Sequence, residues 1–111
     1  MSQDARVAAF LEKHAPLLAE RLEAYLAREI PHLAMQEHID IIMSEWELLR
    51  VEETHDYWPR EAVFWAAVWS IRHLADEDHW REGTTERDLG RILRLLSRGG
   101  ELPRNWTARR S

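Results

Sequence analysis

The amino-acid sequence predicts an all-α fold, a small up-down bundle of four main helices. Glycine and proline are scarce, with four of each in 111 residues, whereas the helix-favouring residues leucine, alanine, arginine and glutamate are abundant. Apolar residues recur every three to four positions through most of the chain, which is the period of one helix face. One segment, residues 58–74, is apolar on nearly every side.

Residues 58–74 are expected to form the central helix of the bundle, or a helix that meets a second chain. No residue from Ala62 to Trp69 is polar, and such a helix is normally buried on more than one side. Trp65 and Trp69 lie ~100° or more from the middle of the main apolar face. That face comprises Phe64, Ala67, Val68, Ile71 and Leu74.

The first helix is predicted from an apolar stripe that begins at Val7 and ends near Tyr25. Pro16 lies inside this stripe and removes one backbone hydrogen bond. We therefore expect a short helix, a bend near His14, and a longer helix that ends near Glu29.

The second helix is predicted to start at Pro31 or soon after and to run to about Glu53. A second apolar line lies roughly opposite its main face, and the flanks between the two are acidic. The main face comprises Met35, Ile39, Ile42, Met43, Trp46 and Leu49, and the second line comprises Ala34, Ile41 and Leu48.

After the central helix, which should end around residues 75–78, we expect a loop at 80–83. Thr84 and Thr85 resemble an N-cap, and a leucine-rich helix follows until Gly99 stops it. Residues 1–100 are thus predicted to form a single helical domain, with residues 101–111 as a polar C-terminal tail that contains Trp106.

Composition and charge limit the function classes. The chain has no cysteine, which excludes disulfides and thiolate chemistry, and it starts without a secretory pattern. The longest apolar run falls far short of the ~20 residues that span a bilayer. We expect a cytoplasmic protein without membrane insertion. Residues 1–80 hold 7 Lys and Arg against 16 Asp and Glu, which argues against nucleic-acid binding.

Two successive helices with two apolar faces each exceed the needs of one small bundle. A homodimer would bury the second faces, because a two-fold axis sets one patch against itself. The predicted interface comprises Ile41, Leu48, Trp65 and Trp69.

An arginine stripe on the last helix offers a second candidate surface. Four arginines fall within ~60° opposite the leucine face. They either solvate the helix or dock an acidic protein, a phosphate or an anionic membrane surface. They are Arg87, Arg91, Arg94 and Arg98.

The alternative function is metal binding or a small metal-dependent enzyme. His73 and Glu77 share a helix face, and Asp76 and His79 lie beside them, so the four could bind a divalent ion. The competing interpretation is a helix end that enters a solvated acidic loop. No pattern combines a nucleophile, a base and an oxyanion site, and none predicts a cofactor. The sequence therefore favours a small protein–protein interaction module: an adaptor, regulator or inhibitor subunit.

Overall fold

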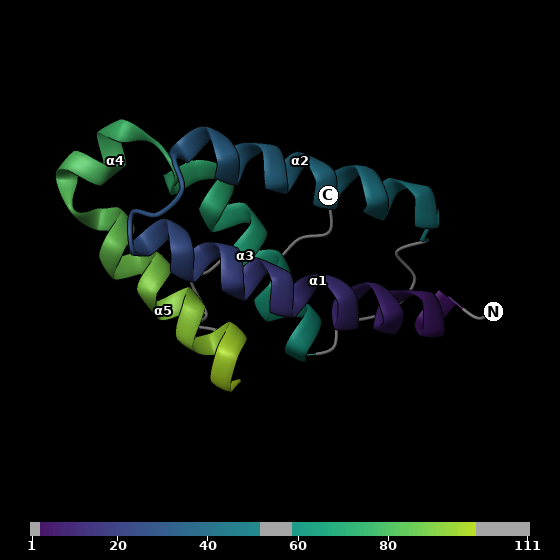
Figure 1. Ribbon diagram of the computed structural model, residues 1–111. Helices are drawn as coiled ribbons and strands as arrows, with labels where there is room; N and C mark the ends of the chain where they lie inside the picture. Colours follow the sequence, from purple (N-terminus) through teal and green to yellow (C-terminus); the bar gives the residue numbers. More distant parts are fainter. Residues whose placement is uncertain (1–2, 52–58, 100–111) are drawn as a thin grey trace.

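The computed structural model describes residues 3–51 and 59–99, which fold into helices alone (Figure 1). Four helices are long and one is a single short segment of six residues. In chain order they are α1 (Gln3–Leu26), α2 (His32–Leu49), α3 (Pro59–Leu74), α4 (Glu77–Glu82) and α5 (Thr84–Arg98). The predicted all-α bundle with four main helices is confirmed.

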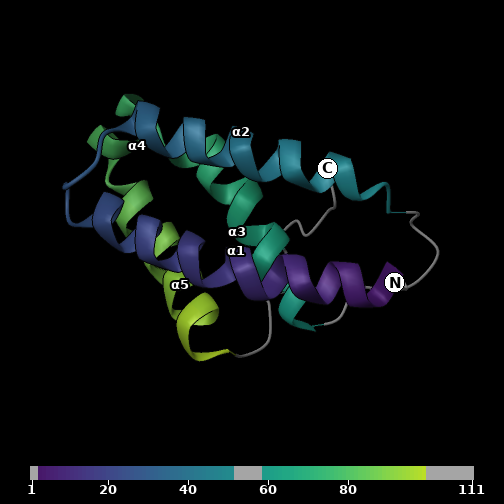
Figure 2. The same ribbon diagram turned by 45° about the vertical axis from the view of Figure 1, so that its right-hand side comes forward.

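Helix α3 is the central helix, as its apolar sequence predicts. It packs against α1, α2 and α5, and every side chain from Val63 to Val68 is buried. Figures 1 and 2 show α2 and α5 on opposite sides of the bundle, with α1 and α3 between them. A helix in this position meets neighbours on several sides, which is why a nearly all-apolar surface suits it.

Helix α1 runs without interruption through Pro16, so the predicted separate short helix does not form. Pro16 withholds the N–H that would bond to the carbonyl of Glu12, but both residues are exposed, so water can reach that carbonyl. Burial of the apolar stripe on both sides of Pro16, from Val7 to Tyr25, outweighs one lost hydrogen bond. The helix ends at Leu26, three residues before the predicted end.

The ends of α1 and α2 use arginine where glycine is usual. After α1, the N–H of Arg28 donates to Tyr25 and the N–H of Glu29 donates to Ala24, at 3.0 and 2.9 Å. This arrangement sets Arg28 at φ 62°, and Arg50 caps α2 in the same left-handed region at φ 51°. Because Arg50 ends α2 at Leu49, the predicted extension to Glu53 is wrong for residues 50 and 51, while 52 and 53 lie outside the described ranges.

Substitution of Arg50 by glycine is expected to stabilise the protein by about 0.5–1 kcal/mol. The left-handed conformation penalises a residue with a Cβ and suits glycine. Arg28→Gly should gain less, since the Arg28 guanidinium pairs with Glu86 at 3.0 Å and lies 4.9 Å from the ring centre of Trp80. Urea denaturation of the two variants measures the difference; equal gains would contradict a stabilising role for the Arg28 side chain.

The segment after α3 differs from the predicted loop. Asp76 caps a new helix, α4, whose residues include Trp80, so the loop predicted at 80–83 is wrong up to Glu82. Neither threonine caps α5, which begins after Gly83. Instead Thr84 Oγ1 donates to the carbonyl of His79 at 3.3 Å, and Thr85 Oγ1 donates to that of Leu74 at 2.9 Å.

Side chains from distant helices satisfy the carbonyl groups at the end of α3. The Gln36 side-chain amide donates to the carbonyls of Arg72 and Ala75, each at 3.3 Å, and the Thr85 hydroxyl donates to the carbonyl of Leu74. These contacts join α2, α3 and α5 at one end of the bundle. None of the described helices combines the length and the apolar character that crossing a membrane requires. The predicted tail, with Trp106, lies outside the described residues.

Candidate protein-interaction surface

The outer face of α2, meaning Leu33, Ile41 and Leu48, is the most exposed aliphatic surface on the described residues. Their exposed fractions are 67%, 54% and 81%. They lie opposite the buried face of α2, which comprises Met35, Ile39, Ile42 and Trp46.

The sequence predicts Ile41 and Leu48 on this surface, with Ala34 as the third member of the line. Ala34 is only half-exposed, whereas Leu33 stands clear of the bundle. Leu33 lies on the same helix as Ile41 and at an angle ~80° from it, so a wider sector of the wheel would have included it. Acidic side chains share the outer face, since Glu37, Asp40 and Glu47 are all exposed.

Trp65 does not belong to this surface, which corrects its predicted place at an interface. Its side chain is fully buried within the chain, and its ring centre lies 4.9 Å from that of Trp46 and 5.1 Å from that of Phe64. Its indole N–H donates to the buried carboxylate of Glu61 at 3.0 Å. Three neighbouring helices cover α3 from more directions than one core face requires, so the part of its second face that Trp65 occupies is internal.

Trp69 is half-buried and has its own partners on α3. The imidazole of His73 stacks on it at 5.5 Å between ring centres, and the guanidinium of Arg72 lies 5.7 Å from its ring centre. These contacts cover part of the indole within one chain. The predicted role of Trp69 in an interface stays a prediction.

The arginine stripe lies on the outer side of α5, and all four of its side chains are exposed. Arg87 pairs with its neighbour Asp88 at 3.3 Å. The acidic outer face of α2 is on the opposite side of the bundle (Figure 2), so the two surfaces do not neutralise each other within one chain. The choice between a solvated face and a docking stripe therefore remains a prediction.

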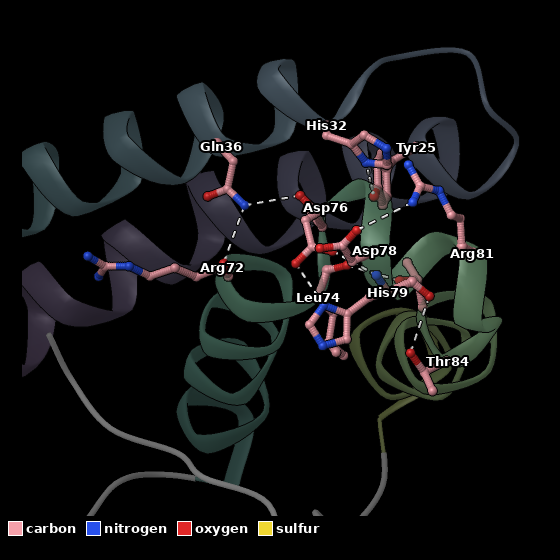
Figure 3. A network of polar contacts seen from close by, with 12 residues as sticks. Tyr25, His32, Gln36, Arg72, Leu74, Asp76, Asp78, His79, Arg81 and Thr84 are labelled. Atoms are coloured by element: carbon pink, nitrogen blue, oxygen red, sulfur yellow. Dashed lines mark hydrogen bonds and ion pairs between the residues drawn. The ribbon is translucent and has the colours of Figure 1, made fainter.

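Two of the four candidate metal ligands, Asp76 and His79, bond to each other (Figure 3), and the other two have partners of their own. Asp76 caps α4 by accepting bonds from the backbone N–H and the Nδ1 of His79, both at 2.7 Å. Glu77 pairs with Arg81 at 3.2 Å, and His73 stacks on Trp69. The helix break at residues 75 and 76 separates His73 from the α4 residues. Within residues 3–51 and 59–99, no three His, Cys, Asp or Glu side chains gather as a metal ion requires.

The Asp76–His79 contact shifts both pKa values in the directions of an ion pair. The backbone N–H of His79, followed by its imidazole, holds the pKa of Asp76 below its ordinary value. The Asp76 carboxylate raises the pKa of His79. Both side chains are well exposed, so this pair anchors the start of α4 rather than holding a buried charge.

An aromatic cluster, which the sequence did not suggest, fills the same end of the bundle. Tyr25, His32 and Trp80 contact one another with ring centres 4.9 to 5.7 Å apart. Burial, together with the charge of Asp76, raises the pKa of Tyr25 to about 12, so its hydroxyl stays protonated and can donate to His32 Nδ1 at 2.6 Å. The cluster lines a cavity of about 400 Å³ and joins α1, α2 and α4.

The seam between α1 and α2 contains buried polar groups. The Nε2 of His14 contacts the carboxylate of Glu45, which also accepts bonds from Lys13 at 3.2 and 3.3 Å. His14 is buried. The Nδ1 of His14 and the Nε2 of His38 lack a hydrogen-bond partner. Burial lowers the pKa of His38, and electrostatic interactions with Arg21 and His14 lower it further.

An apolar hollow opens between α1, α3 and α5. Its volume is about 570 Å³, and its walls include Pro16, Val63 and Leu96. Leu95 and Leu96 of α5 lie beside it and are only half-buried. No family model, curated protein or solved structure matches this chain.

Proposed function

We propose that this chain is a protein–protein interaction module, an adaptor, regulator or inhibitor subunit, whose contact surface is the outer face of α2 and whose first partner is a second copy of itself. The observation that carries the proposal is the exposure of Leu33, Ile41 and Leu48 on one helix. Exposed aliphatic side chains that share one face are typical of contact surfaces. A cytoplasmic location belongs to the same proposal and rests on the lack of cysteine.

The expected association is weak. Burial of three partly exposed aliphatic side chains per chain contributes roughly 6–12 kcal/mol per dimer before costs, using about 1.5–3 kcal/mol for each full burial. Association itself costs an estimated 4–15 kcal/mol. The balance favours dissociation constants of micromolar or weaker, since 1 μM corresponds to about 8 kcal/mol. With Trp65 internal, the surface is smaller than the sequence suggested.

Sedimentation equilibrium from roughly ten to several hundred micromolar, a range chosen from this affinity scale, tests the proposal. The unmodified chain should shift from monomer towards dimer as its concentration rises. Ile41→Glu should remain monomeric across the range and keep its helical circular dichroism, because it places a charge where the contact would be dry.

Leu17→Glu is the matched control, because Leu17 is also an exposed leucine, 42% exposed, but on α1. It should dimerise like the unmodified chain. A monomer at every concentration for the unmodified chain would overturn self-association. Equal association of Ile41→Glu and the unmodified chain would remove the outer face of α2 from the proposal.

A further inference from the structure

We infer that two copies of the chain pair α2 against α2 in antiparallel orientation, with Ile41 beside the two-fold axis and Leu33 of each copy against Leu48 of the other. This inference rests on the proposed function and adds the geometry of the contact. Leu33 precedes Ile41 by eight residues, and Leu48 follows it by seven. At ~1.5 Å per residue the outer leucines lie ~12 and ~10.5 Å from Ile41.

This near-symmetric spacing is what a two-fold antiparallel pair requires. A two-fold axis that crosses α2 between residues 40 and 41 brings position 33 opposite position 48, and Ile41 next to its own copy. All three exposed aliphatic side chains of each copy then meet an aliphatic partner. An axis half a residue earlier would set Leu33 against Glu47 and Leu48 against His32, and an axis half a residue later would set Leu33 against Leu49 and Leu48 against Ala34, which are only half-exposed.

The charges on α2 favour the antiparallel orientation over the parallel one. Within α2 the sequence has four Asp and Glu residues and no Lys or Arg. A parallel pair sets Glu37 and Glu47 each against the same carboxylate of the other copy. In the antiparallel register, Glu37 lies opposite Ser44, and Glu47 lies opposite Ala34. Asp40 lies opposite Ile41, so it is the one outer-face carboxylate that stays close to its own copy. Opposed helix dipoles favour the same choice.

The position of α2 in the bundle leaves room for this contact. Helix α2 lies at one edge of the molecule, where it packs on α1 and α3 through the face opposite Ile41 (Figures 1 and 2). Leu33 and Leu48 stand near its two ends and are the two most exposed large apolar side chains among residues 3–51 and 59–99. A second α2 can therefore lie along its whole length.

Cross-linking of single-cysteine variants tests the orientation, and the lack of native cysteine makes each variant specific. Ile41→Cys, Leu33→Cys and Leu48→Cys are treated with a short bis-maleimide at concentrations where sedimentation shows dimers. Ile41→Cys should give covalent dimer by itself. Leu33→Cys and Leu48→Cys should each give little, whereas their equimolar mixture should give several-fold more.

Leu17→Cys on α1 is the control for random collisions, and its yield sets the background. Strong cross-linking of Leu33→Cys alone and of Leu48→Cys alone would overturn the inference in favour of a parallel pair. Background yields for all α2 variants, with dimers present in sedimentation, would place the dimer contact elsewhere. A monomeric unmodified chain would instead overturn the proposed function itself, before any cross-linking result is considered.

Discussion

Substitution of Trp65 by alanine is expected to lower the free energy of unfolding by about 3–5 kcal/mol. The indole is fully buried and packs against the rings of Phe10, Trp46 and Phe64, so its removal leaves a cavity that rigid neighbours cannot fill. The buried Glu61 carboxylate also loses the N–H donor 3.0 Å away. Urea denaturation followed by circular dichroism gives the value.

Trp69→Ala is the matched control, because it removes the same side chain from the same helix. Trp69 is only half-buried, and its neighbours His73 and Arg72 are exposed, so the expected loss is no more than about 1–2 kcal/mol. If the two variants lost equal stability, or Trp69→Ala lost more, the assignment of Trp65 to the core would be wrong.

Glu45→Ala should destabilise the protein by about 1–3 kcal/mol at neutral pH, although Glu45 is not deeply buried. The cost arises at its partner His14, which is buried and would then have neither ring nitrogen bonded. Lys13, by contrast, is exposed, so water solvates its ammonium group once the Glu45 carboxylate is removed. Glu47→Ala on the outer face of the same helix is the control and should change stability by less than about 0.5 kcal/mol.

Two further measurements separate this cause from a general effect of charge. The double variant His14→Leu/Glu45→Ala should recover most of the loss, because leucine needs no hydrogen bond in the same space. Hydrogen bonding from Lys13, with His14 adding to it, holds the pKa of Glu45 below its ordinary value of 4.5. The stability that the ionised Glu45 carboxylate contributes is therefore present above pH 4.5 and is lost as the pH falls through the folded-state pKa of Glu45. The difference in the free energy of unfolding between the unmodified chain and Glu45→Ala should shrink in acid. A difference that stays constant with pH would contradict the ion pair between Glu45 and Lys13.

The helical periodicity predicted the fold class and the position of α3, because both depend on local patterns. The run from Ala62 to Trp69 has no polar side chain, so a helix with those residues has to be covered on several sides. Gly99 likewise marked the end of α5, since its φ of 79° is a conformation that glycine adopts readily. The same local rules did not predict the ends of α1 and α2, where arginine adopts the left-handed conformation.

Errors arose where a distant contact decided between two local possibilities. Thr84 and Thr85 match an N-cap pattern, but α3 and α4 end beside them, and their hydroxyls bond to those carbonyls instead. Asp76 looked like part of an acidic loop, and a contact with His79 makes it the cap of α4. The helical period does not show which unpaired backbone carbonyl at a helix end a side chain will bond to.

In the candidate surface, too, local sequence patterns predicted some features and contacts between distant segments decided the others. By itself the sequence determined that Ile41 and Leu48 lie away from the buried face of α2, because the angle between two residues on one helix follows from their spacing. Only the tertiary structure decided that Trp65 is internal while Leu33 is exposed. A side chain is buried or exposed according to how many helices surround its own, and that number depends on packing between segments far apart in the chain. Helix α3 has neighbours on three sides, and α2 at the edge of the bundle has an open one.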